Sequence, residues 1–536
     1  MSESSVSDVP SAESTRPEYM GSSGGSIERL LAPLLVIGLG AGFRVLWLMF
    51  TNFTQEDAFI TFRFAQQIAR GNGFVYNLGE RVYGTTTPLF TLMLAGWLNL
   101  FQGDIISGAR TIDLIAAVGA MVFVWLTLRR IGGPPWQPVF VIALLAVSPR
   151  LWVFDTQGME TPLVILFLSA SWWMFSQNKA AWAGALAGAM LWTRIDVALW
   201  PVCMVVVAFS LGRKREGLQI GLWTTLVYLP WLVFASIYFG SPIPFTAIAK
   251  WVAYVAFDHT PLTTHALIIL RGLKPFSLDL PIPGAGLLLS VATVAIATWH
   301  GLRLRTTPAA LVLLVFAVVE AVRLILTRAT SFAHYSVPTL WAFLVLSGAG
   351  LATLWSMRKD FAPVARKAYP LALLFVLVVG LVQGVMAAFR TQDTQVFRHE
   401  LALKAIGLWL HKNTPEQATV LLEPLGYVGY FSDRHMFDEV GLVTPQIVAL
   451  KRKQLAAPAY IEALVPDYYV MHCDDALRWF KDQEDETAFF RNNYTHVVTF
   501  NPVAFDPADE YEDPYYGAFA RNACYEVWGI ATRQRN

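Results

Sequence analysis

The sequence is poor in charged residues and in cysteine, and each shortage excludes a class of protein. Only 15% of the 536 residues are charged, whereas soluble domains carry about 25%, so most of this chain is not suited to face water. The formal net charge is +1 and the Lys and Arg residues form no single patch, which argues against nucleic acid as a partner. Three cysteines are too few for a disulfide framework, and none forms the CxxC pair of a zinc site.

Apolar segments recur instead between about residues 31 and 391. Hydrophobic residues make up 55% of the chain, and many segments approach the roughly 20 residues that cross a hydrocarbon core. Clusters of Lys and Arg, which are retained on the cytoplasmic side, mark alternate breaks between the segments. The pattern therefore predicts a polytopic α-helical protein of the plasma (inner) membrane, with about eleven transmembrane helices and a cytoplasmic N-terminus.

Three regions follow from this pattern. Residues 1–28 are rich in Ser, Gly and Pro and are expected to form a disordered cytoplasmic tail. Residues 29–391 form the transmembrane domain, with outer loops at 51–105, 149–160, 240–282 and 327–336. Residues 392–536 have an ordinary composition, with apolar runs at 418–422 and 468–471 that are typical of strands. We expect this last region to be an extracytoplasmic soluble α/β domain, periplasmic or extracellular.

The first outer loop holds the candidates for catalysis, Glu56 and Asp57. One interpretation of Asp57 is a helix cap, in a capping box that starts at Thr54. The other is a general base, because a carboxylate at the outer membrane surface is placed where a lipid-borne phosphate and an acceptor hydroxyl could meet. Arg63 lies on the helix that follows and is a candidate for substrate binding.

The other outer loops supply further polar candidates, each with an alternative structural role. Asp155 and Glu160 lie in the second loop, where Glu160 could also cap a helix. Arg194 could bind phosphate or pair with Asp196, and Lys250 could bind phosphate or reach the lipid headgroups. The last short loop carries Arg328, His334 and Tyr335; a histidine can titrate near neutral pH, although a structural role is common.

Several of these runs resemble the polytopic glycosyltransferases of the GT-C superfamily, particularly mycobacterial arabinofuranosyltransferases and related bacterial enzymes. The resemblance covers most of the chain, and the runs that carry it are EDAFITFR (56–63), GFVYN (73–77) with Gly79 and Glu80, GMETP (158–162), Thr193 with Arg194, and PFT (244–246) with Ala249 and Lys250. Family members usually have two aspartates where this chain has Glu56 and Asp57, which leaves open which carboxylate is the base. They commonly have Asn where it has Phe245.

The resemblance implies a glycosyltransferase that takes a pentose such as arabinofuranose, or a hexose such as mannose, from a polyprenyl-phosphate donor. The acceptor would be a cell-envelope glycan, lipid or protein on the outer face, and the same resemblance implies inversion of the anomeric centre. Asp57, supported by Glu56, would take the acceptor proton, while Lys250, Arg194 and Arg328 would stabilise the leaving phosphate.

The resemblance implies no certain cofactor, but some members of the family hold a divalent metal such as Mg²⁺ or Mn²⁺ with acids of the first two outer loops. Asp155 and Glu160 are the candidates here for a metal site or a second carboxylate. In the C-terminal region, Cys473 and Cys524 could form a disulfide if that region faces an oxidising compartment.

Two other functions are consistent with many spans. A transporter or lipid flippase would place its polar residues near the bilayer midplane, often in two related halves, and neither feature is evident here. A membrane-anchored assembly protein would leave the loop carboxylates without a task. If the glycosyltransferase interpretation holds, Glu56, Asp57, Glu160 and Lys250 should converge on one cavity.

Overall fold

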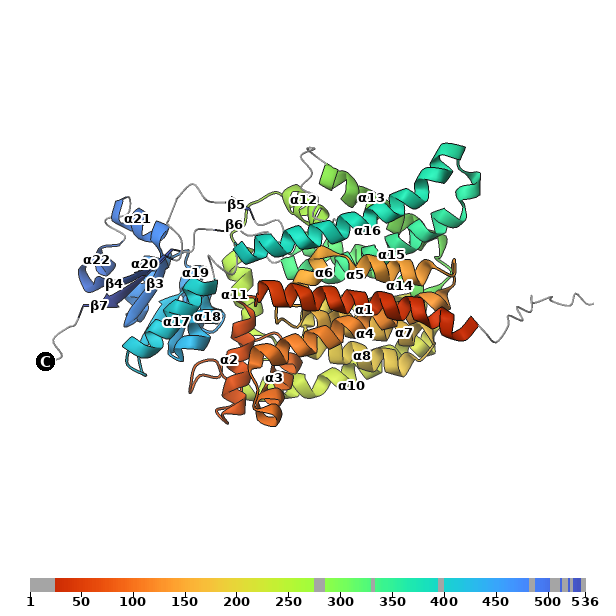
Figure 1. The fold of residues 1–536 in the computed structure, drawn as a ribbon. Helices are drawn as coiled ribbons and strands as arrows, with labels where there is room; N and C mark the ends of the chain where they lie inside the picture. Colours follow the sequence, from red (N-terminus) through yellow and green to blue (C-terminus); the bar gives the residue numbers. More distant parts are fainter. Residues whose placement is uncertain are drawn as a thin grey trace, which may run out of the picture.

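The structure, a computed structural model, describes residues 25–273, 285–328, 333–393, 400–481, 487–501, 511–512, 519–520 and 524–531. It consists of a bundle of long helices that run side by side, with a smaller α/β domain at one end (Figure 1). Most of the predicted tail lies outside the described residues. Helix α1 begins at Gly25, however, so the last four residues assigned to the tail are helical.

The regular elements of the membrane part are all helices among the described residues. Its α-helices are α1 (Gly25–Thr51), α2 (Ala58–Ala69), α3 (Pro88–Phe101), α4 (Ile105–Ile131), α5 (Gln137–Ala146), α6 (Pro149–Phe154), α7 (Thr161–Ser176), α8 (Ala180–Thr193), α9 (Leu199–Ser210), α10 (Lys214–Tyr238), α11 (Phe245–Tyr254), α12 (Leu262–Gly272), α13 (Ala285–Arg303), α14 (Pro308–Leu326), α15 (Val337–Ser356) and α16 (Pro363–Thr391). Short 3-10 helices are η1 (Ile195–Val197), η2 (Ala333–Ser336) and η3 (Arg358–Asp360).

Six helical stretches of the described chain are long and apolar enough to cross a membrane: Leu30–Thr51, Ile105–Ile131, Lys214–Tyr238, Pro308–Leu326, Ala333–Ser356 and Pro363–Thr391. Helices α3, α5, α7 and α8, and the stretch formed by η1 and α9, are apolar but shorter. The predicted class, a polytopic helical membrane protein, is therefore confirmed. The number of eleven crossings stays a prediction, because length and composition alone do not decide the shorter helices.

Small residues bring the backbones of α8 and α10 together. A Cβ atom on Gly184 would lie 2.4 Å from the carbonyl oxygen of Ile220, and one on Gly188 would lie 2.7 Å from that of Thr224. Such close approach is how membrane helices gain van der Waals contact. The hydroxyl of Thr224 also donates to the Gly184 carbonyl at 3.1 Å. This contact fixes α8, which ends directly before Arg194.

The C-terminal region folds around a five-stranded mixed sheet in the order β2-β1-β3-β7-β4, with β1, β2 and β3 parallel and β7 antiparallel to both β3 and β4. Its strands are β1 (Thr419–Leu422), β2 (His435–Asp438), β3 (Tyr468–His472), β4 (Tyr494–Phe500) and β7 (Tyr525–Ile530), with a separate pair β5 (Tyr511–Glu512) and β6 (Phe519–Ala520). Its helices are α17 (Leu401–Asn413), α18 (Leu425–Ser432), α19 (Pro445–Arg452), α20 (Ala457–Leu464), α21 (Cys473–Lys481) and α22 (Ala488–Asn493). The strands predicted at 418–422 and 468–471 match β1 and β3.

The two parts meet where α2 packs against α18. Phe59 and Phe62 of α2 are fully buried, and the Phe59 ring lies 3.9 Å from that of Tyr427. Beside this apolar contact, the buried side chain of Glu400 accepts a hydrogen bond from the backbone N–H of Thr54 at 3.0 Å. The first outer loop, which carries Glu56 and Asp57, is thus held between the membrane helices and the C-terminal domain.

Candidate active site

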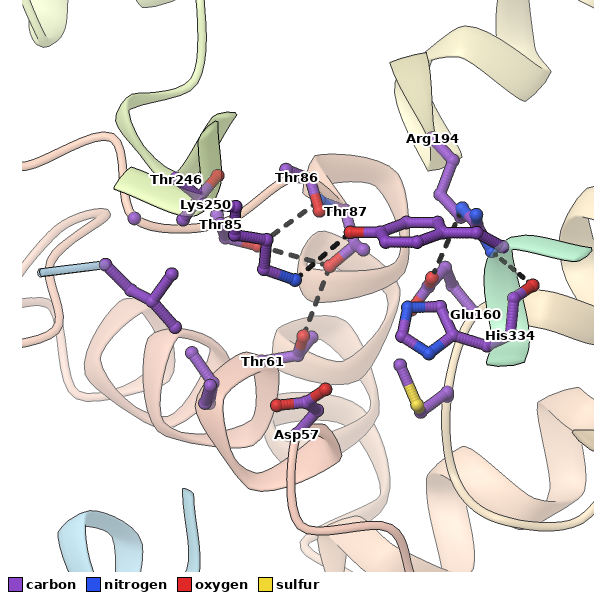
Figure 2. A pocket seen from close by; sticks show the side chains of 15 residues that line it. Asp57, Thr61, Thr85, Thr86, Thr87, Glu160, Arg194, Thr246, Lys250 and His334 are labelled. Carbon is purple, nitrogen blue, oxygen red and sulfur yellow. Dashed lines mark hydrogen bonds and ion pairs between the residues drawn. The ribbon is translucent and has the colours of Figure 1, made fainter. Parts of the chain in front are cut away.

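A cavity lies where the loop regions at 51–105, 149–160, 240–282 and 327–336 meet (Figure 2). Its volume is about 60 Å³, several times what one water molecule needs. The lining residues are Asp57, Ile60, Thr61, Gly84, Thr85, Thr86, Thr87, Met159, Glu160, Arg194, Thr246, Lys250, His334, Tyr335 and Leu442. Six of the predicted site residues therefore converge on one cavity, and they come from five separate segments of the chain.

Asp57 occupies the residue directly before α2, but its side chain makes no capping hydrogen bond. The hydroxyl of Thr54, which would start the predicted capping box, accepts instead from Arg110 at 2.9 Å. A carboxylate that is not used for capping is available to the cavity, where Asp57 lies on the same side as Thr61 (Figure 2). The geometry does not support the capping interpretation of Asp57, whose side chain lines the cavity instead.

Glu56 does not line the cavity, although it was expected there with Asp57. Its carboxylate accepts a hydrogen bond from the backbone N–H of Gly426 in α18. Burial, with the charges of Asp57 and Glu423 beside it, raises the pKa of Glu56 well above its ordinary value. Asp57, Glu160 and Lys250 thus converge on one cavity as expected, whereas the expectation for Glu56 was wrong.

Glu160 and Asp155 have different surroundings, although both belong to the loop at 149–160. Glu160 lines the cavity and lies 3.8 Å from the guanidinium of Arg194. Burial raises its pKa, and the charge of Arg194 opposes that rise. Asp155 is buried in an ion pair with Arg44 of α1, with distances of 2.6 and 2.8 Å. The prediction that Asp155 belongs to the site is therefore corrected, because Arg44 engages its carboxylate elsewhere.

Asp113 of α4 supports the second loop, and the sequence analysis missed it. It is fully buried and accepts a hydrogen bond from the backbone N–H of Gly158 at 3.0 Å. Gly158 has a φ of 80°, a conformation that glycine adopts without steric cost. Asp113 and Gly158 together place Met159 and Glu160 at the cavity. An acid inside an apolar span was the available signal.

Arg194 and Lys250 provide the positive charge of the cavity. Arg194 is buried and makes a bidentate ion pair with Asp196, at 2.9 and 2.6 Å. The predicted ion pair is therefore present, and Arg194 lines the cavity as well. Lys250 donates a hydrogen bond to the hydroxyl of Tyr335 at 3.1 Å. Burial lowers the pKa of Lys250, but the neighbouring Tyr335 and Asp57 outweigh burial and raise it, which keeps the ammonium charged.

His334 and Tyr335 enter the cavity from η2. His334 is buried, and its backbone carbonyl accepts from Arg194 at 3.4 Å. The Tyr335 ring lies under the guanidinium of Arg194, 4.9 Å from its centroid, and 5.4 Å from the ammonium of Lys250. Tyr335 therefore contacts both cations and fixes their separation.

A group of threonines, which the sequence analysis did not select, forms another wall of the cavity. The Thr87 hydroxyl lies 3.2 Å from that of Thr61 and 3.1 Å from that of Thr85. Three adjacent threonines before a proline, in the run GTTTP at 84–88, were the signal. Their hydroxyls can both donate and accept hydrogen bonds, as a site for sugar hydroxyls or phosphate oxygens requires.

Arg63 and Arg328 do not line the cavity, and both predictions of substrate binding are corrected. Arg63 is buried, and its guanidinium donates to the backbone carbonyls of Tyr76, Gly429 and Arg434. It therefore joins α2 to the C-terminal domain. Arg328 lies 3.8 Å from Asp258 of the loop at 240–282, an ion pair between two loops.

The residues proposed for a metal do not fit a metal site. Within the described residues, no group of three or more His, Cys, Asp or Glu side chains is placed to hold an ion. Asp155 is engaged by Arg44 and Glu160 lies beside Arg194, so each acid faces a cation of the protein.

Cys473 and Cys524 form a disulfide that connects the start of α21 to the start of β7. Their Cα atoms are 5.5 Å apart, and 51 positions separate them in the chain. The remaining cysteine, Cys203, is buried in α9. Neither cysteine of the disulfide lines the cavity, and the bond concerns the stability of the C-terminal domain.

Part of the chain is similar in sequence to known proteins. The chain is 28% identical over 224 residues to a terminal beta-(1->2)-arabinofuranosyltransferase of Mycobacterium tuberculosis, a match that covers 36% of this chain and 34% of the relative. It is 26% identical over 272 residues to the protein of the same name from Corynebacterium glutamicum, covering 45% of this chain and 39% of the relative. The matches thus span little more than a third of these relatives. A family model described as a domain of unknown function (DUF8728) matches residues 388–528.

Solved structures show the same fold at low sequence identity. The archaeal oligosaccharyltransferase AglB of Archaeoglobus fulgidus, solved with an inhibitory peptide and a dolichol-phosphate, superposes with a TM-score of 0.58 at 11% identity, over 96% of this chain and 75% of its own. ArnT of Cupriavidus metallidurans, bound to undecaprenyl phosphate, superposes with a TM-score of 0.58 at 13% identity, over 95% of this chain and 98% of its own. The resemblance predicted from the sequence is confirmed: the chain is a polytopic membrane protein that shares the fold of these two structures and is similar in sequence to terminal arabinofuranosyltransferases.

Proposed function

We propose that this protein is a glycosyltransferase that moves a sugar from a polyprenyl-phosphate donor to a hydroxyl group of a cell-envelope acceptor. One observation carries the proposal: the carboxylate of Asp57, which does not cap its helix, lines the same cavity as two cations, Lys250 and Arg194. The transfer of a sugar from a lipid phosphate needs both a base for the acceptor and positive charge for the leaving group.

The proposed reaction is a single displacement at the anomeric carbon. Asp57 takes the proton of the acceptor hydroxyl while the acceptor oxygen forms a bond to the anomeric carbon of the donor. The bond between that carbon and the phosphate oxygen breaks, and the lipid phosphate leaves with the electron pair. Attack opposite the leaving group inverts the anomeric centre.

The positive side of the cavity is organised to receive the phosphate. Lys250 is an ammonium with three N–H donors, of which Tyr335 accepts one. Arg194 is held in place by Asp196, so little conformational entropy is lost when it binds an anion. Fixed cations in a poorly hydrated site stabilise developing charge strongly.

The two arabinofuranosyltransferase relatives make a polyprenyl-phosphate arabinofuranose the first donor to test. The solved relatives hold dolichol-phosphate and undecaprenyl phosphate, which supports a lipid phosphate as the donor class. The acceptor would be a glycan, glycolipid or protein on the outer face of the membrane, where the C-terminal domain would also lie. No nucleic acid partner is proposed.

The test is to incubate the purified protein with polyprenyl-phosphate pentoses and hexoses and synthetic glycan acceptors, and to follow the acceptor by mass spectrometry. We expect transfer from at least one donor, and its loss in Asp57→Asn. The matched control is Glu462→Gln, which changes an exposed carboxylate of α20. If no donor supports transfer by the folded protein, the proposal fails and a transporter or lipid flippase becomes the better candidate.

A further inference from the structure

One wall of the cavity comes from the C-terminal domain. Among the residues that line the cavity, Leu442 belongs to that domain and lies in the loop between β2 and α19. It is buried, with 7% of its surface exposed. A residue from a domain outside the membrane helices thus limits the space in which a substrate would lie.

Asp438 determines the path of this loop. It is fully buried, and its carboxylate accepts hydrogen bonds from the backbone N–H groups of Gly441, Leu442 and Val443, at 2.6, 2.7 and 2.8 Å. Its own N–H donates to the hydroxyl of Thr444 at 2.9 Å. Hydrogen bonds to a charged group are about twice as strong as neutral ones, so one side chain holds the loop closed.

The loop also fits tightly against the threonine wall. A Cβ atom on Gly84 would lie 2.7 Å from the Cγ1 of Val443 and 3.1 Å from the carbonyl oxygen of Leu442. Gly84 directly precedes Thr85, whose hydroxyl forms that wall together with the hydroxyl of Thr87. The Asp438 loop and the threonines therefore bound the same side of the cavity.

We propose that Leu442 determines which acceptor the cavity admits, and that Asp438 is the residue that positions Leu442. This inference rests on the proposed function and deepens it. The acceptor is the substrate concerned because the donor's lipid belongs in the membrane, whereas Leu442 belongs to the domain that would lie outside it. The acceptor class is a glycan whose terminal sugar contacts Leu442 on an apolar face and offers its hydroxyl to Asp57.

The test compares Leu442→Ala with Leu477→Ala, which alters an exposed leucine of α21 (47% of its surface). The substrates are polyprenyl-phosphate arabinofuranose and an octyl arabinofuranosyl disaccharide. We expect Leu442→Ala to raise the acceptor KM at least fivefold with an unchanged donor KM, and Leu477→Ala to change neither. Leu442→Val, a smaller change, should give an intermediate acceptor KM.

Asp438→Asn tests the positioning role. The amide replaces one acceptor oxygen with a donor that faces backbone N–H groups, so the loop should shift and the acceptor KM should rise as in Leu442→Ala, again without a change in donor KM. If the wild type transfers sugar but both variants keep the acceptor KM within twofold, or change the donor KM instead, the inference alone is overturned. If the wild type transfers nothing from any donor, the proposed function fails first and the inference fails with it.

Discussion

The carboxylate of Glu56 accepts a hydrogen bond from the backbone N–H of Gly426 in the C-terminal domain, whereas Asp57, the next residue, lines the cavity. Successive side chains at the start of a helix point about 100° apart, so adjacent acids serve different parts of the protein. Glu56 connects two domains, and Asp57 is the candidate base.

The first prediction separates these two acids. Asp57→Asn should lower kcat by about 10²–10⁴-fold, the range for loss of a general base. Glu56→Gln keeps an oxygen that can accept from Gly426, so we expect less than a tenfold loss. Initial rates of sugar transfer measure both. An equal loss of kcat in the two variants, with unchanged melting temperatures, would contradict the assignment.

Lys250→Met should lower kcat/KM by about 10²–10³-fold, because it removes a cation at the expected position of the leaving phosphate. The side chain is close in size, so the loss would reflect charge. Lys404→Met, at an exposed lysine of α17, is the control and should retain wild-type rates. Wild-type kcat/KM in Lys250→Met would remove Lys250 from the mechanism.

The ion pair between Arg44 and Asp155 should matter for stability rather than for chemistry. Breaking a buried pair from one side leaves an uncompensated charge and costs about 3–5 kcal/mol, so Arg44→Ala and Asp155→Ala should each lower the melting temperature. The double variant should lose less than the sum of the two. The protein that remains folded should retain its kcat, and a selective loss of kcat in Asp155→Ala would return that residue to the site.

Glu400 should make stability depend on pH. Burial raises its pKa to about 8, above the ordinary value of about 4.3. Between these values the folded protein holds a proton that the unfolded chain has released, so the free energy of unfolding falls as the pH rises through this window and levels off above about 8.

Glu400→Gln should remove this contribution, because the amide is always neutral and can still accept the hydrogen bond from Thr54. The measurement is the melting temperature between pH 5 and pH 9 for the wild type, for Glu400→Gln and for the exposed control Glu462→Gln. The wild type and the control should lose more stability than Glu400→Gln as the pH rises. Parallel curves for all three proteins would contradict the prediction.

The disulfide gives a test of compartment. If the C-terminal domain lies outside the membrane in an oxidising environment, Cys473 and Cys524 should resist a maleimide reagent in denatured protein until a reductant is added. Replacing both by serine should cost about 2–4 kcal/mol of stability. Because Cys203 is a free thiol, the denatured protein should show one reactive thiol before reduction, and three in protein taken directly from cells would contradict an oxidising location.

Local properties explain what the sequence alone predicted here. Apolar length and the placement of cations are short-range features, and they predicted the helical membrane part. The strands at 418–422 and 468–471 followed from local runs of β-forming residues. Asp57, Glu160, Arg194 and Lys250 could be selected because acids and bases in the outer loops of an apolar chain have few structural explanations.

Only the tertiary structure decided which polar residues share a space. Arg63 resembled a ligand of phosphate until three backbone carbonyls were found around its guanidinium, and Asp155 resembled a site acid until Arg44 was found beside it. Leu442 could not be selected at all, since it approaches Gly84 across 358 positions of the chain. Charge and apolar length are local properties that can be read from the sequence. The partner of a buried charge, in contrast, depends on how distant segments pack together. The set of residues that share this cavity was therefore decided by the tertiary structure.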